Sequence, residues 1–257
     1  SFATRYLHTS AGVMVTASHN PSKYNGYKVY WSDGAQLPPQ KAEAIAKQME
    51  AIDVFTGFKT CDYDAAVKSG RIEILGEETD ELFMEQVLRM AIDKQAVADV
   101  ADEFKIVYTP FHGCGWKLVP EALRGLGVKN LYCVEQQMVL DGTFPTVASP
   151  NPENPEGFYL AIELADKVGA DFILGTDPDS DRVGIMVRGA DGKFIPVTGN
   201  QTGVLLLDYL IGAMRRAGKM PAKPYFLKTI VTTEMARKVA ESNGVTCCDT
   251  FTGFKFM

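Results

Sequence analysis

Short apolar runs, each bounded by Gly, Asp or Pro, recur along the chain and predict buried β-strands. The runs are only four or five residues long and largely apolar, which is typical of strands covered on both faces of a sheet. The predicted strands are residues 12–16, 105–108, 130–134, 171–174 and 225–228.

Between these runs the apolar positions repeat with helical spacing. Pro38 and Pro39 open one such segment, since a proline in the first helical turn lacks an N–H that would be unbonded there anyway. Asn154-Pro155 opens a second segment by the same logic. Further helices are predicted over residues 80–92, 117–126, 198–215 and 233–242. The alternation of strands and helices predicts an α/β fold of tandem mixed, mainly parallel sheets layered with helices.

Two polar stretches divide the chain into three parts. Residues 96–103 separate a first block from a second one that restarts with strand, helix and strand. Lys, Pro and Gly then gather at residues 218–223, between a long predicted helix and a new strand. We therefore expect domains over residues 1–97, 98–218 and 219–257, of which the first is partial and the last is an incomplete beginning.

The chain carries 26 basic and 32 acidic side chains, a formal net charge of -6, and no run of five Lys or Arg. This balance argues against nucleic acid or an anionic membrane surface as a partner. The longest apolar stretch, residues 204–214, contains Asp208 and is shorter than the roughly 20 residues that span a bilayer. We therefore expect no membrane segment, and an anionic ligand would be met by a local basic group.

The five cysteines are odd in number and show no CxxC spacing. They indicate reduced thiols in a cytoplasmic protein rather than a disulfide framework or a zinc site. The chain begins at Ser1 without an initiator Met or a signal peptide and ends at Met257 without a natural stop, so we expect a piece of a longer protein. Its oligomeric state is not indicated by the sequence.

The first candidate for chemistry is the segment Thr16–Pro21, which directly follows a predicted buried strand. Open α/β sheets bind ligands at the carboxyl ends of their strands, so Ser18 would be presented in a crevice. Its hydroxyl could act as a nucleophile or as a carrier of a phosphoryl group. The alternative is that Ser18 and Asn20 only build a turn before Pro21.

The second candidate is the segment Asp177–Arg182, which again follows a predicted buried strand. Asp177, Asp179 and Asp181 would repel one another in a tight loop unless a cation lay between them. Oxygen ligands alone favour Mg2+ over zinc, and the neighbouring Arg182 favours a phosphate nearby. The alternative is a solvated acidic turn.

A third segment, Phe111–Gly115, is rich in glycine and lies between a predicted strand and a predicted helix. Such a turn can cradle a phosphate. Without a Lys-Ser or Lys-Thr ending it is not a P-loop, and we interpret the segment around His112 as a structural turn.

Together these motifs resemble the α-D-phosphohexomutase superfamily, and within it the phosphoglucomutase and phosphomannomutase group with its phosphopentomutase-like branch. Thr16–Pro21 with Tyr24–Lys28 resembles the phosphoserine loop of the family, and Asp177–Arg182 resembles its metal-binding loop. Tyr108–Gly113 and Ser149–Glu153 resemble parts of its second domain. The resemblance covers nearly the whole chain and implies phosphohexomutase-like domains.

The resemblance also implies roles for individual residues. Ser18 would carry a phosphoryl group, one of whose oxygens joins Asp177, Asp179 and Asp181 around Mg2+. A phosphoserine adds about 1.5 to 2 negative charges, so the metal and Arg182 would be needed to hold it beside three carboxylates.

Three further positions match functional residues of the family. Lys28 matches a lysine that exchanges a proton with the attacking sugar hydroxyl, His19 neighbours the phosphate, and Lys255 matches a lysine on the substrate side of the third domain. For His19 a loop-shaping role is the alternative. For Lys255 the match is only four residues long. The same four residues also occur at positions 56–59, so the motif is not specific.

The implied activity is an intramolecular phosphotransfer, an isomerase reaction between hexose 1-phosphate and hexose 6-phosphate through a bisphosphorylated sugar. Phosphoglucomutase is the first expectation, with glucose 1-phosphate as substrate. The alternatives are phosphomannomutase, phosphopentomutase, a non-catalytic sugar-phosphate-binding module, and a Mg2+ phosphohydrolase with Asp177 or Asp179 as nucleophile. Because the resemblance implies missing regions at both ends, we expect this piece alone to bind Mg2+ weakly and to have negligible mutase activity.

Overall fold

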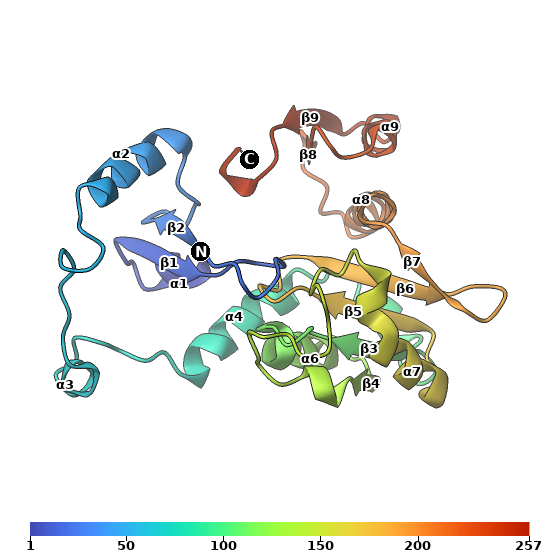
Figure 1. The fold of residues 1–257 in the computed structure, drawn as a ribbon. Helices are drawn as coiled ribbons and strands as arrows, with labels where there is room; N and C mark the ends of the chain where they lie inside the picture. Colours follow the sequence, from blue (N-terminus) through green and yellow to red (C-terminus); the bar gives the residue numbers. More distant parts are fainter. Residues whose placement is uncertain (257) are drawn as a thin grey trace. The chain divides into compact units, whose positions relative to one another are not determined.

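A computed structural model describes residues 1–256 and divides the chain into two compact units (Figure 1). The first unit comprises Ser1–Met14, Lys28–Glu85 and the chain from Gly253 onward. The second comprises Val15–Tyr27 and Gln86–Thr252. Both candidate loops therefore belong to the second unit.

The first unit contains one small sheet and several helices. β1 (Ala11–Val15) pairs with β2 (Tyr27–Trp31), and β1 confirms the strand predicted at residues 12–16. α2 (Pro39–Glu50) starts where the two prolines predict, with Pro38 as its N-cap. The other elements are α1 (Phe2–Tyr6), α3 (Tyr63–Lys68), α4 (Glu77–Arg89) and the 3-10 turn η3 (Phe254–Phe256).

The second unit is built on a five-stranded mixed sheet in the order β4-β3-β5-β6-β7. The inner strand β3 is parallel to its neighbours β4 and β5, while β5 pairs antiparallel with β6, and β6 antiparallel with β7. The strand bounds are β3 (Lys105–Thr109), β4 (Asn130–Cys133), β5 (Phe172–Thr176), β6 (Val183–Arg188) and β7 (Phe194–Val197). The first three confirm predicted strands.

Helices connect these strands and complete the core. α7 (Tyr159–Val168) packs on β3 and follows the 3-10 turn η2 (Pro155–Phe158) that begins at the predicted proline. The core of this sheet gathers Val107, Phe111, Phe158, Ala161 and Ile173, each at most 1% exposed. Burying a phenylalanine completely contributes about 1.5–3 kcal/mol, so this cluster fixes the sheet beneath the acidic loop. The remaining elements are α5 (Gln95–Ala98), α6 (Gly115–Gly125) and the 3-10 turn η1 (Glu135–Gln137).

The end of the second unit forms a smaller layer. β8 (Tyr225–Thr229) pairs in parallel with β9 (Thr246–Thr250), and α9 (Glu234–Ser242) connects them. α8 (Gly199–Arg216) packs against α9 and begins with a capping box between Thr198 and Gln201. Their contact buries Leu207, Ile211, Ala236 and Ala240.

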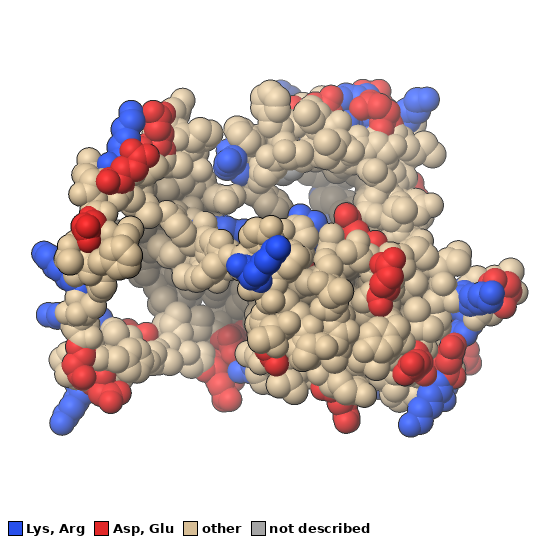
Figure 2. Space-filling view, in the orientation of Figure 1, with Lys and Arg blue, Asp and Glu red and all other residues tan. Residues whose placement is uncertain are grey.

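Charged side chains of both signs are interspersed over the face drawn in Figure 2. In residues 1–256, no helix combines the length and the apolar character needed to cross a bilayer.

Candidate active site

The segment Thr16–Pro21, here called the serine loop, forms a tight turn after β1. Ser18 adopts a left-handed backbone conformation with φ 55, and its N–H donates to the Thr16 hydroxyl at 2.8 Å. The Asn20 side chain donates to the Ala17 carbonyl at 2.9 Å. Asn20 therefore does build the turn, and the turn leaves the Ser18 hydroxyl available for other contacts.

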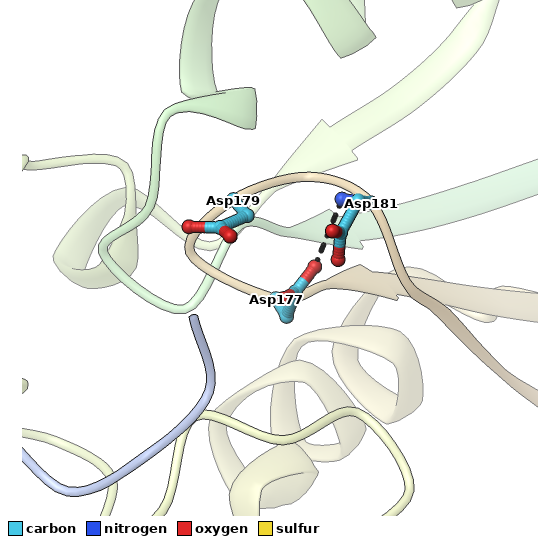
Figure 3. Close-up of side chains that lie close together, drawn as sticks. All are labelled: Asp177, Asp179 and Asp181. Atoms are coloured by element: carbon cyan, nitrogen blue, oxygen red, sulfur yellow. Dashed lines mark hydrogen bonds between the residues drawn. The ribbon is translucent and has the colours of Figure 1, made fainter. Parts of the chain in front are cut away.

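The segment Asp177–Arg182, here called the acidic loop, connects β5 to β6. Asp177 is fully buried, and its Oδ1 accepts the backbone N–H groups of Asp181 at 3.0 Å and of Arg182 at 2.9 Å. Carboxylate oxygens of Asp177, Asp179 and Asp181 all lie within 4.8 Å of one another (Figure 3). The loop thus collects three carboxylates around one point.

Side chains join the two loops across a long sequence separation. The Ser18 hydroxyl donates to Asp177 Oδ2 at 3.2 Å, although the two residues are 159 positions apart. The Thr16 hydroxyl donates to Asp179 Oδ1. Two hydroxyls near the start of the chain therefore contact carboxylates of the acidic loop.

The electrostatics of this cluster favour a cation. Burial raises the pKa of the Asp177 carboxyl above its ordinary value, and Asp181 and Asp179 act in the same direction, while the Arg182 amide opposes them. A divalent ion would offset the repulsion among the three carboxylates, which adds to the effect of burial on this pKa. The donors are carboxylate and hydroxyl oxygens, which Mg2+ prefers, so these residues fit a Mg2+ site.

His19 lies next to the serine hydroxyl. Its Nδ1 is 3.1 Å from Ser18 Oγ, and its side chain is half-buried. Such a ring nitrogen can exchange a proton with the hydroxyl or hydrogen-bond to a phosphate placed on it. The contact is compatible with both interpretations of His19.

The other predicted residues are placed differently. Arg182 contributes its backbone amide to Asp177 and is exposed. Lys28 is the second residue of β2 and half-buried, and Lys255 is exposed in η3, 5.2 Å from the centre of the Phe256 ring. Lys28 and Lys255 belong to the first unit, and their contacts with a substrate stay predictions.

Thr16 is the residue of this site to which the sequence assigned no role. Its hydroxyl accepts from Ser18 and donates to Asp179, so it contacts both loops. The sequence did contain a signal for Thr16, because a threonine hydroxyl often accepts a hydrogen bond from the backbone N–H two residues later. The sequence could not show that the same hydroxyl contacts Asp179 on the acidic loop.

Three family models match consecutive parts of the chain. They describe the α/β/α domains I, II and III of phosphoglucomutase/phosphomannomutase, and they match residues 1–55, 81–192 and 198–257 respectively.

Individual relatives agree with these matches. The phosphoglucomutase of Staphylococcus saprophyticus is 36% identical over 258 residues, covering all of this chain and 45% of its own length. A Staphylococcus aureus phosphoglucomutase is also 36% identical, over 265 residues. The chain thus spans less than half the length of these curated relatives.

Solved structures share the fold. A putative phosphomannomutase from Thermus thermophilus superposes with a TM-score of 0.73 at 24% identity, covering 99% of this chain and 51% of its own. An Aspergillus fumigatus N-acetylphosphoglucosamine mutase, solved with GlcNAc-6P and magnesium, superposes with a TM-score of 0.58 at 17% identity, covering 99% of this chain and 58% of its own. With all three domain models matched in order, the chain belongs to the phosphoglucomutase/phosphomannomutase superfamily.

Proposed function

We propose that the protein containing this chain is a phosphohexomutase that moves a phosphoryl group between the 1- and 6-hydroxyls of a hexose, with Ser18 as the phosphoryl carrier. The observation that carries the proposal is the 3.2 Å contact between Ser18 Oγ and Asp177 inside a cluster of three carboxylates. A phosphoryl group on this hydroxyl would bring further negative charge to the carboxylates. It can be held there only where a cation neutralises that charge.

The proposed reaction has two transfers. In the first transfer the Oγ–P bond of phosphorylated Ser18 breaks and Oγ takes up a proton, while the free sugar hydroxyl forms an O–P bond and gives up its proton, which yields a bisphosphorylated sugar. The sugar then turns, its other O–P bond breaks and that sugar oxygen takes up a proton, while the Ser18 hydroxyl forms a new Oγ–P bond and releases its proton. Positioning and charge neutralisation supply most of the catalysis in such transfers.

The chain offers groups for the protons and the charge. His19 Nδ1, 3.1 Å from Ser18 Oγ, can hold the proton of the serine hydroxyl. Lys28 is proposed to exchange the proton of the sugar hydroxyl, and Lys255 to bind the substrate. Arg182 is proposed to bind phosphate oxygens with its guanidinium group.

Asp177, Asp179 and Asp181, with an oxygen of the Ser18 phosphate, would hold Mg2+. When bound, this ion supplies positive charge to the phosphoryl oxygens. The magnesium-bound Aspergillus fumigatus mutase, which shares the fold, supports this assignment.

The curated relatives favour glucose phosphates as substrates, because those at 36% identity are named phosphoglucomutase. An Aspergillus fumigatus relative solved with glucose 1,6-bisphosphate supports a bisphosphorylated intermediate. Mannose and pentose phosphates are the alternatives. A non-catalytic module is disfavoured, because Ser18 and all three carboxylates are present and close together.

The test uses the full-length protein. Mass spectrometry of the freshly purified enzyme should find one phosphoryl group on the peptide containing Ser18. Ser18→Ala should abolish turnover of glucose 1-phosphate in a coupled assay primed with glucose 1,6-bisphosphate. The matched control is Ser22→Ala, in the exposed turn that follows Pro21, which should keep the wild-type rate.

Wild-type turnover in Ser18→Ala would overturn the proposal. A Mg2+ phosphohydrolase would instead release inorganic phosphate and form an acyl phosphate on Asp177 or Asp179, which borohydride would trap.

A further inference from the structure

The loop between β3 and α6, residues Pro110–Cys114, lies directly against the acidic loop. The Cys114 N–H donates to the Pro178 carbonyl at 2.9 Å. Gly113 lies so close that any Cβ there would overlap the Pro178 backbone. Since Pro178 separates Asp177 from Asp179, the β3–α6 loop contacts the acidic loop between these two carboxylates.

This loop holds an unfavourable backbone conformation. Phe111 and His112 are consecutive residues with φ 47 and 64, a region that residues other than glycine rarely adopt. Such a conformation persists only when its surroundings impose it. Phe111 is held by an edge-on contact with Phe158, with ring centres 5.0 Å apart.

A chain of hydrogen bonds through four side chains also holds the loop in this conformation. The Phe111 N–H donates to the Thr109 hydroxyl at 3.1 Å, and that hydroxyl donates to Gln137 Oε1 at 2.6 Å. Gln137 Nε2 donates to the Thr146 hydroxyl at 2.9 Å, and that hydroxyl lies 2.9 Å from His112 Nε2. The loop and the turn after β4 are therefore bonded together at several points.

Two backbone bonds complete the arrangement. The His112 N–H donates to the Gln137 carbonyl at 3.0 Å, and His112 Nδ1 lies 2.9 Å from the Val139 carbonyl. A carbonyl only accepts, so Nδ1 must carry a proton, and neutral His112 is the Nδ1–H tautomer. Thr109 and Gln137 are fully buried, so bonds lost here cannot be replaced by water.

We propose that Gln137, together with His112 and Thr146, is a positioning residue for the metal site. It holds the β3–α6 loop in its left-handed conformation, and through Cys114 and Gly113 that loop holds Pro178 and the flanking carboxylates in place. This inference rests on the proposed function, because it assumes that Asp177 and Asp179 bind the metal ion. Gln137 has no part in the transfer itself.

The test measures metal binding rather than turnover. Mn2+ is titrated into the full-length protein, and free Mn2+ is followed by electron paramagnetic resonance. Gln137→Met keeps the side-chain length but removes the amide oxygen and nitrogen. It should weaken Mn2+ binding by about tenfold, the lower end of the effect of residues that position metal ligands. The exchange of the Cys114 amide proton should accelerate in the same variant.

Two further variants guard against a general loss of structure. Thr146→Val removes one hydroxyl at a half-buried position and should give a smaller loss of Mn2+ affinity in the same direction. Ile211→Val lies in the core between α8 and α9 and serves as the stability control. It should lower the melting temperature while leaving Mn2+ binding unchanged.

The outcomes separate this proposal from the metal site itself. If Asp177→Asn loses Mn2+ while Gln137→Met and Thr146→Val bind it as tightly as the wild type, the positioning role is wrong and the metal site stands. If the folded full-length wild-type protein binds no Mn2+, both are wrong. A neutral His112 with its proton on Nε2, seen by nitrogen NMR, would also contradict the proposal.

Discussion

The hydroxyl of Thr16 bonds two loops that are far apart in the sequence. It accepts the Ser18 N–H and donates to Asp179, two residues proposed to carry the phosphoryl group and the metal ion. Ser18 is held in a left-handed conformation, which costs of order 1–3 kcal/mol and requires such support.

Removing that hydroxyl should therefore impair the reaction. In the full-length enzyme, Thr16→Val should lower kcat by about 10–100-fold, because both loops lose the bond that aligns them. Thr16→Ser keeps the hydroxyl and should retain most of the activity. Equal rates for the two variants would show that the hydroxyl does not matter.

Two glycines should respond in opposite ways to the same substitution. Gly113→Ala should lower the free energy of unfolding by about 1–3 kcal/mol, because the new methyl group overlaps Pro178. Gly203→Ala in α8 meets no atom within 4 Å and should raise it by about 0.5–1 kcal/mol, since glycine is a poor helix residue. Urea denaturation of the chain checks both, and stabilisation by Gly113→Ala would contradict the packing.

Among the elements, a group of charged side chains joins β8, α9 and β9. Lys228, whose side chain is 1% exposed, lies 2.8 Å from Glu234 and 2.9 Å from Asp249. Arg237 contacts the same two carboxylates. Hydrogen bonds from Lys228 and Arg237 lower the pKa of Glu234 below its ordinary value of 4.5.

A lowered pKa in the folded state makes the ionised carboxylate stabilising. The contribution of Glu234 is therefore present above its ordinary pKa and is lost as the pH falls through the lowered value. Glu234→Gln should reduce the melting temperature near about pH 7, and this difference from the wild type should vanish toward about pH 3. Glu241→Gln, whose contact with Arg237 is 3.6 Å, is the control and should have a smaller effect.

The elements that the sequence predicted best are those marked by one clear sequence feature, such as a pair of prolines or an apolar run. α2 starts at its prolines, and β3 has a short apolar run that is buried inside a sheet. The apolar residues of α2 recur with helical spacing, yet Ile45 is only half-buried and Ala42, Ala46 and Met49 are exposed. The periodicity shows which residues share a face but not whether another element covers it.

The strands that were not predicted have weaker signals. β6 and β7 form a hairpin whose turn contains Asp191-Gly192, a pair that favours tight turns and could have indicated it. β9 has the sequence Thr-Cys-Cys-Asp-Thr, in which no apolar run stands out. Its pairing with β8 depends on contacts that only the folded chain provides.

For the whole molecule, the contact between the serine loop and the acidic loop did not follow from strand order. β1 pairs with β2 in a sheet of its own, whereas β5 lies in the five-stranded sheet. The local pattern left Ser18 open between a phosphoryl carrier and a turn residue, and the resemblance to a family favoured the carrier. The division into domains at residues 97/98 and 218/219 stays a proposal.

The piece and the full-length protein should differ in activity. The chain spans 45% of the length of the Staphylococcus saprophyticus phosphoglucomutase, so we expect the 257-residue chain to show negligible turnover of glucose 1-phosphate. The coupled assay compares it with the full-length enzyme at equal concentration. Near-normal turnover by the chain alone would contradict this expectation.

The acidic loop is also the connection of an antiparallel pair, with Thr176 opposite Val183 at its two ends. Closing so short a connection costs little chain entropy, whereas bringing Ser18 to Asp177 requires a contact across 159 residues. During synthesis, the carboxylates can therefore assemble as soon as β6 has paired. An ion captured at that stage would favour the nascent sheet by mass action, so the cation would assist folding as well as phosphoryl transfer.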